Sequence, residues 1–260
     1  MNDIFFITEH GAREVQNMRQ SRDSLNPQDL GALSLMFNQR EPLKISNDIA
    51  EIKIQGPLLN QATELEKAMG ATDYSDLISE IEEANNQSVK SILLSINTPG
   101  GSVAGIEETY AAIKESKAPV YAYNEGSAAS AGYYLAAACD KICASQSAIT
   151  GSIGTILTMK DFSKLEESMG ITTKIITNKG ADLKATGSGE LTETQEQFLQ
   201  DMVDDLGQQF LLRVQENREN VDMEVARAGW YYPKDALALG LIDYMGNKDD
   251  FKELINTLTK

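Results

Sequence analysis

A serine and a glycine-rich turn are the parts of this sequence best suited to breaking a bond. Ser130 stands in the small-residue run Gly126–Tyr134, at the start of an expected helix. A serine there is commonly a helix cap, but an open α/β fold can also present it to a ligand at the carboxyl end of its sheet. The turn Pro99-Gly100-Gly101 precedes another expected helix. A turn without side chains exposes N–H groups that favour developing negative charge, although simple chain reversal is the commoner reason for such a turn.

A serine nucleophile needs a base, and the sequence offers one histidine and several lysines. His10 is the only histidine and lies far from Ser130 in a weakly patterned N-terminal part, so a Ser-His-Asp triad would have to recruit that segment. A lysine can replace histidine where burial away from carboxylates removes its charge. Lys179 and Lys184 lie in a glycine-flanked loop, residues 178–189. A lysine in a loop of this kind is ordinarily exposed to solvent.

Alternating strand and helix patterns must position these residues. Residues 49–54 alternate apolar and charged side chains, Val89–Ile96 is a buried strand that ends at the Pro99 turn, and Val120–Tyr123 is a third strand before the Ser130 segment. Helices are expected between them, over residues 74–86 and 103–115. This order predicts an α/β fold of βαβ units with a largely parallel sheet.

The C-terminal part is expected to be helical. Thr192 and Gln195 form a capping-box pattern that opens a helix to about Asn217. Pro233 suits the first turn of a shorter helix that Gly240 ends. Residues 1–47 show no strong period and are interpreted as an N-terminal appendage to one domain over residues 48–260.

The charge, hydropathy and cysteine content of the chain indicate which partners, membranes and cofactors to expect. The formal net charge of −16 repels phosphate backbones, so nucleic acid is not expected to bind. Apolar runs are too short to span a membrane, and the N-terminus lacks the pattern of a secretory signal, which together predict a cytoplasmic protein. Cys139 and Cys143 fit two buried reduced thiols rather than a disulfide framework or a metal site. No cofactor or metal is expected.

Several segments taken together resemble the signal peptide peptidase A family of serine peptidases, which have a ClpP/crotonase-like fold. Their order and spacing hold over residues 49 to 250. The matching pieces are Ser95–Gly101, Ala128–Tyr134, Asp140–Ile142, Thr150–Gly154, Lys164 and Leu165 with Gly170, and Ala236–Asp243.

The resemblance assigns roles to individual residues. It places the nucleophile at Ser130 and the lysine base at Lys184, with Lys179 as the alternative because Ala185 stands where the family often has aspartate. It places the oxyanion hole at the backbone N–H groups of Gly101 and Ser130, and it gives Ser152 the task of hydrogen-bonding the lysine. The expected activity is peptide-bond hydrolysis by a Ser-Lys dyad.

The resemblance also implies a biological setting. A single module without an anchor is similar to the phage head-maturation proteases, which act in the host cytoplasm or prohead on capsid or scaffold proteins. A bacterial enzyme that degrades signal peptides or other small peptides is one alternative, and an inactive scaffold or assembly protein of the same fold is another. Family members form homo-oligomeric rings in which serine and lysine can come from neighbouring subunits.

Overall fold

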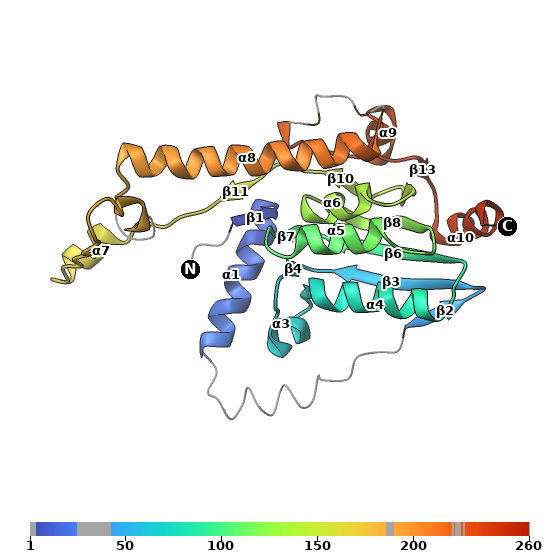
Figure 1. Ribbon diagram of the computed structural model, residues 1–260, viewed down its shortest axis with the longest axis horizontal. Coiled ribbons are helices and arrows are strands. Elements are labelled where there is room, and N and C mark those ends of the chain that lie inside the picture. The colour runs from blue at the N-terminus through green and yellow to red at the C-terminus, as the bar shows by residue number, and fades with distance from the viewer. Residues whose placement is uncertain are drawn as a thin grey trace.

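The computed structural model describes residues 4–24, 43–185, 190–219, 221, 225 and 227–259. Its main sheet, in which Figure 1 labels β10, β8, β6, β3 and β2, follows the order β12-β10-β8-β6-β3-β2, and β9 pairs with both β8 and β13. Only β2 and β12 pair antiparallel with their neighbours in this sheet. The strands are β2 (Lys44–Ser46), β3 (Ile49–Gln55), β6 (Ser91–Thr98), β8 (Val120–Ala129), β9 (Lys141–Ala144), β10 (Ile149–Gly151), β12 (Trp230–Tyr231) and β13 (Tyr244–Met245).

Both faces of the main sheet are buried, because side chains at successive strand positions point to opposite sides. Ile52, Leu94 and Ala122 belong to the larger core, which also contains side chains of α4, α5 and α6. Leu93 and Tyr121, at the intervening positions, pack with α10. These helices are α4 (Tyr74–Asn86), α5 (Ile106–Lys114), α6 (Ala131–Ala137) and α10 (Lys248–Leu258).

A second sheet of short strands lies beside the first and has the order β11-β1-β7-β4-β5. β7 immediately follows the Pro99 turn, so the two sheets meet there. The strands are β1 (Ile4–Ile7), β4 (Leu58–Leu59), β5 (Thr72–Asp73), β7 (Gly100–Ser102) and β11 (Ile156–Leu157), and the helices next to them in sequence are α1 (Glu9–Ser24) and α3 (Glu64–Ala68). The segment interpreted as an appendage thus contributes β1 to this sheet.

The long helix α8 (Glu193–Asn217) links the sheet to an outlying part of the chain. Its C-terminal half packs on α6, where the ring of Phe210 lies 4.9 Å from that of Tyr134. Its N-terminal half extends with α7 (Ser163–Ser168) to the left of Figure 1. The 3₁₀ turn η1 (Asp182–Ala185) is fixed to this far end, because Gln195 Nε2 donates to the Asp182 carbonyl at 2.8 Å. The chain then closes with α9 (Pro233–Ala238) before β13 and α10.

The predicted α/β class, largely parallel sheet and helical C-terminal part are confirmed. Asp73 caps α4 by accepting from Ser75 N–H, and the capping box of Thr192 and Gln195 opens α8 as expected. β8 is longer than predicted. Beyond the predicted end at Tyr123, the Asn124 side chain donates to the Ile149 carbonyl and helps β8 to continue beside β10 as far as Ala129.

Candidate active site

Ser130 occupies the junction between β8 and α6 in a conformation that few non-glycine residues adopt. Its φ is 54° and its ψ is −118°, and its side chain makes no cap hydrogen bond to α6. Instead, the hydroxyl donates to the Gly154 carbonyl at 3.4 Å. Backbone strain of this kind costs about 1–3 kcal/mol and is kept where surrounding structure enforces it, often in active sites. The residue is fully buried in this state of the chain.

The Gly100–Ser102 strand is held beside α6 by Thr98 and by close backbone contact. The Thr98 hydroxyl donates to the Gly56 carbonyl at 2.6 Å and accepts from Gly100 N–H at 3.1 Å. A Cβ at Gly101 would lie 2.0 Å from the Leu58 carbonyl oxygen, so only glycine fits. Close packing against Leu58 therefore explains why glycine stands at position 101, in addition to the predicted role of its N–H in the oxyanion hole.

The loop with Ser152 wraps around Ser130. Gly151, at one end, accepts the Ser130 N–H at 2.8 Å, and Gly154, at the other, accepts its hydroxyl. Ser152 has a φ of 55° and donates its N–H to the Gly229 carbonyl at 2.7 Å. The structure thus brings Ser152 into the immediate surroundings of Ser130.

The hydrogen bond from Ser130 N–H to the Gly151 carbonyl affects one of the two expected oxyanion-hole donors. Since Ser130 N–H already donates within the sheet, it is not free to bind an oxyanion in this state. The first N–H groups of a helix have no partner inside that helix. Ala131 is the first residue of α6, so its N–H is a structural alternative that the sequence motif did not indicate.

Neither candidate lysine lies in the part of the chain that surrounds Ser130. Lys184 is exposed on η1, and Lys179 is exposed in the turn before it. Gln195, which holds η1, and Phe210, which packs near α6, are 15 residues apart on α8. At 1.5 Å per helical residue, this separation is about 22 Å. Within one chain, the predicted dyad is therefore not assembled.

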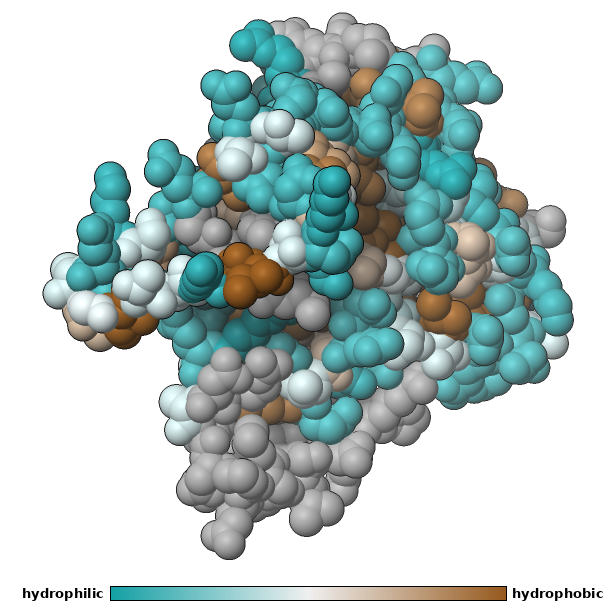
Figure 2. Space-filling model, turned by 60° about the vertical axis from the view of Figure 1, so that its left-hand side comes forward, coloured by the Kyte–Doolittle hydropathy of each residue, from teal (hydrophilic) through white to brown (hydrophobic). Residues whose placement is uncertain are grey.

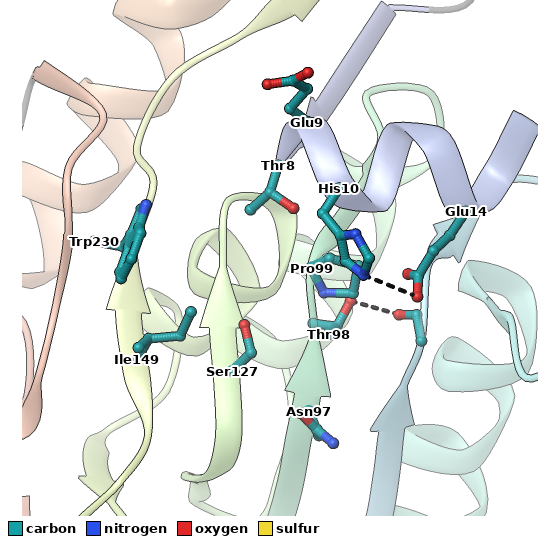
Figure 3. Close-up of a pocket in the computed structure, with 11 residues that line it drawn as sticks. Thr8, Glu9, His10, Glu14, Asn97, Thr98, Pro99, Ser127, Ile149 and Trp230 are labelled. Atoms are coloured by element: carbon teal, nitrogen blue, oxygen red, sulfur yellow. Dashed lines mark hydrogen bonds and ion pairs between the residues drawn. The ribbon is translucent and has the colours of Figure 1, made fainter.

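A cavity of about 590 Å³ opens at the carboxyl edge of the main sheet (Figure 3). Thr98, Pro99 and Ser127 form part of its wall, and the first turns of α1 contribute His10 and Glu14 on the opposite side. Open α/β sheets bind ligands at this edge. Ser130, which is fully buried at the junction of β8 and α6, does not belong to the wall of this cavity.

His10 does not assemble the alternative triad in this structure. Its side chain is 82% exposed and pairs with Glu14 at 3.5 Å on the same helix face. The nearest serine of the cavity wall is Ser127, which lies on β8 itself rather than at a strained turn.

Two further motif segments have structural roles. Asp243 accepts from Arg218 and from Ile142 N–H, both at 2.8 Å, and so ties the C-terminal tail to β9. Burial raises the pKa of Asp243, but these hydrogen bonds outweigh it and hold the pKa below its ordinary value. Asp140 accepts from Val120 N–H at 2.8 Å and fixes the start of β8. These carboxylates support the sheet rather than the chemistry.

Both cysteines are buried and unpaired, as predicted. Over the described ranges, no cluster of three or more histidine, cysteine or acidic side chains is arranged to hold a metal ion. In the same part of the chain, no helix combines the length and apolarity needed to cross a bilayer.

Comparison with known proteins places these features in a family. A putative signal peptide peptidase SppA from Enterococcus faecium is 34% identical over 173 residues, which cover 64% of this chain and 50% of the relative. Capsid assembly protease C of Escherichia phage lambda is 27% identical over 262 aligned positions, which cover 95% of this chain and 59% of the relative. The chain therefore spans only half to three fifths of the length of these relatives. Among solved structures, a ClpP1 variant from Listeria monocytogenes aligns with 76% of this chain and 92% of its own at 15% identity, with a TM-score of 0.48.

Two family profiles match the chain itself. The NfeD1b N-terminal domain matches residues 48–164, which include the Ser130 segment. Peptidase family S49 matches residues 112–260, which is more than half of the sequence and includes both Ser130 and Lys184. On this match, and in agreement with the motifs, the chain belongs to peptidase family S49.

Proposed function

We propose that this protein is a serine endopeptidase in which Ser130 attacks the peptide carbonyl and Lys184 accepts the serine proton. The observation that carries the proposal is the strained, non-capping conformation of Ser130 at the start of α6. An ordinary cap would have an extended backbone and would bond to the helix N–H groups. In this mechanism, the serine oxygen forms an ester with the substrate acyl group, the proton passes through lysine to the leaving amine, and water then hydrolyses the ester.

Gly101 N–H and a helix N-terminus suit the oxyanion of this reaction. Both belong to backbone segments held by neighbouring carbonyls and by Thr98, so they need not reorganise during the reaction. The second donor is Ala131 N–H in this state, or Ser130 N–H if the bond to Gly151 opens. Ser152 is proposed to orient the lysine amine, since its loop encloses Ser130.

The lysine is proposed to come from a neighbouring subunit. Lys184 sits on an arm, residues 158–185 and 190–206, that extends from the sheet and carries exposed apolar side chains. Figure 2, in which this side comes forward, shows brown apolar patches among hydrophilic side chains. Exposed apolar surface of this kind commonly marks a protein interface. The exposed apolar residues of the arm are Phe162, Leu165, Met169, Ile171, Ile175, Ile176 and Phe198.

We infer a role in phage or prophage capsid assembly, with capsid or scaffold proteins as substrates and the host cytoplasm or prohead as the location. The alignment with the lambda capsid assembly protease extends over 95% of this chain, whereas that with the SppA relative covers 64%. The longer match favours the phage role over a peptidase for signal peptides. An inactive scaffold would have no reason to keep the strained Ser130.

The test of the nucleophile is the Ser130→Ala variant. Peptide hydrolysis should fall by at least about 10³-fold, since only binding and oxyanion stabilisation remain. A fluorophosphonate probe should label Ser130 of the unmodified chain, with the site located by mass spectrometry. Ser147→Ala, at an exposed position beyond β9, is the control and should keep both properties. Hydrolysis that survives in Ser130→Ala would refute the assignment.

The base is tested by comparing two lysines of the same loop. Lys184→Ala should lose nearly as much activity as Ser130→Ala, because no other amine would take the serine proton. Lys179→Ala should have a mild effect. The measurement is kcat with a fluorogenic peptide, and a reversed ranking would move the base to Lys179.

A further inference from the structure

Strand β1 lies between β7, which follows the Pro99 turn, and β11, which follows the loop around Ser130. On one side it pairs antiparallel with β7, and Phe6 is opposite Gly101. On the other side it pairs antiparallel with β11, which follows the loop whose Gly154 carbonyl accepts the Ser130 hydroxyl. Peptides that bind by β-augmentation add an extended strand to a sheet edge in this way. The N-terminal strand therefore occupies the position that an extended substrate would take next to the proposed nucleophile.

The backbone of β1 also engages the proposed oxyanion donor. Thr8 N–H donates to the Pro99 carbonyl at 2.9 Å, which makes this a hydrogen-bonded position of the antiparallel ladder. Hydrogen-bonded and non-bonded positions alternate along such a ladder. Phe6 and Gly101 are therefore the next bonded pair, and Gly101 N–H is directed at β1. A substrate carbonyl can reach this donor only after β1 has left.

The side chains of β1 rest in a small apolar cluster of their own. Phe5 and Ile7 point to the same face of the strand and pack with Leu59, Ala71 and Ile156. Val15 and Met18 of α1 complete the cluster, which is separate from the two cores of the main sheet. A peptide in place of β1 would meet the same apolar floor. The groove thus suits apolar side chains at alternate positions.

Helix α1 is fitted closely to the turn that carries the site. A Cβ at Gly11 would lie 2.7 Å from the Cβ of Pro99, closer than real Cβ atoms come. Gly11 N–H also donates to the Thr8 hydroxyl at 3.1 Å, which fixes the junction between β1 and α1. Figure 3 shows Thr8 and His10 on the side of the cavity opposite the strand ends. The docking of this segment depends on a specific glycine.

We infer that residues 4–24 are an intramolecular occupant of the peptide-binding groove, which covers the site reversibly and is displaced by an extended peptide with apolar side chains at alternate positions. The inference rests on the proposed peptidase function. Displacement does not require unfolding of the main cores, because β1 and α1 bury their apolar side chains in the separate cluster.

A reversible disulfide tests this inference in the full-length chain. Phe5 and Ser102 are opposite each other at a non-hydrogen-bonded position, where Cα atoms are about 4.5 Å apart and a disulfide can form. The Phe5→Cys, Ser102→Cys double variant, once oxidised, should lose most of its peptide hydrolysis and of the fluorophosphonate labelling of Ser130. Reduction should restore both. Each single variant is a control that should not respond to oxidation, since Cys139 and Cys143 are buried.

The outcomes separate the two claims. Equal activity and labelling in the oxidised and reduced double variant would overturn the inference while leaving the peptidase function intact. No labelling of Ser130 in the unmodified chain, at any concentration of probe, would refute the peptidase function and the inference with it.

A second variant opens the groove instead of locking it. Gly11→Ala should raise the rate of peptide hydrolysis, because the added methyl group collides with Pro99 while alanine otherwise favours a helix more than glycine does. Asn17→Ala, at an exposed position of the same helix, is the matched control and should leave the rate unchanged. Equal rates for the two variants would contradict the inference.

Discussion

Two serines with unusual backbone conformations frame the candidate site at the scale of single residues. Ser130 has a φ of 54° and Ser152 a φ of 55°. Each is held by its N–H, which donates to Gly151 in one case and to Gly229 in the other. Such conformations persist only when the surroundings enforce them. The backbone around the proposed nucleophile is therefore already fixed in this structure, whereas the proposed base, Lys184, does not lie beside it.

The Gly101→Ala variant tests whether the backbone of β7 beside Leu58 is as closely fixed as the contacts indicate. Gly101→Ala should lower the free energy of unfolding by roughly 1–3 kcal/mol and abolish hydrolysis, because its Cβ would lie 2.0 Å from the Leu58 carbonyl oxygen and force the backbone to shift. Urea unfolding and a peptide assay measure the two effects. Gly246→Ala, where no heavy atom lies within 4 Å of the added Cβ, should change neither. A fully active Gly101→Ala protein would show that β7 is more pliable than described.

At the scale of elements, α10 is bound to the sheet by a buried carboxylate. Glu51 on β3 accepts from Lys248 at 2.8 Å, Lys252 at 2.6 Å and Ser95 at 2.9 Å. Burial raises the pKa of Glu51, but these three hydrogen bonds outweigh it and lower the pKa to about 2. The side chain thus stays charged over the whole neutral and mildly acidic range. It holds α10 on the face opposite α4 and α5.

This depressed pKa predicts how stability depends on pH. The contribution of Glu51 is fully present above its ordinary pKa of 4.5 and is lost as the pH falls toward about 2, since the unfolded chain takes up the proton first. Glu51→Gln should destabilise the protein by about 1–3 kcal/mol at pH 7 and should lose less further stability between pH 4.5 and 2. Urea unfolding at several pH values measures both.

The control for Glu51 is a carboxylate in an exposed pair. Asp48 lies 3.3 Å from Lys90, and both side chains are more than 60% exposed. Asp48→Asn should therefore have little effect at any pH. If the two variants showed the same pH dependence, the role assigned to Glu51 would be wrong.

The elements with strong periodicity could be predicted from the sequence, and the short ones could not. β3, α4 and α8 begin and end close to the predicted residues, because alternation, helical spacing and caps are local signals. β1 is only four residues long, and its apolar run has no alternation that distinguishes strand from loop. Its pairing with β7 depends on a partner about 95 residues away in sequence. A local pattern does not encode such a contact.

The same distinction applies to the site. Ser130 and Ser152 directly follow β8 and β10, and Gly101 lies on β7 just beyond the end of β6, so their shared edge could be expected from the motif order. The hydrogen bonds by which Thr98 holds Gly100 and Gly229 holds Ser152 are tertiary contacts, so the sequence shows no recognisable pattern for them. The donation of Ser130 N–H to Gly151 likewise emerged only from the pairing of β8 with β10.

In the whole molecule, the arm, residues 158–185 and 190–206, leaves much of its apolar surface uncovered by the rest of the described chain. It exposes apolar side chains, among them Ile176 at 82%, and it carries Lys184 on η1, which Gln195 holds at a point about 22 Å along α8 from Phe210. A ring of identical subunits would cover the apolar surface with a neighbour and could bring Lys184 to the neighbour's Ser130. Heterologous contacts of this kind close into rings when the rotation allows.

Subunit complementation shows whether Ser130 and Lys184 act together across an interface. Ser130→Ala and Lys184→Ala proteins, each inactive alone, are dissociated, mixed in equal amounts and reassembled, and peptide hydrolysis is measured. If serine and lysine act across the interface, random mixing leaves an intact pair at about a quarter of the sites, so activity should return to about a quarter of the unmodified level. If the mixture stays as inactive as its components although mixed assemblies form, the dyad proposed here does not exist across subunits, and the account is contradicted.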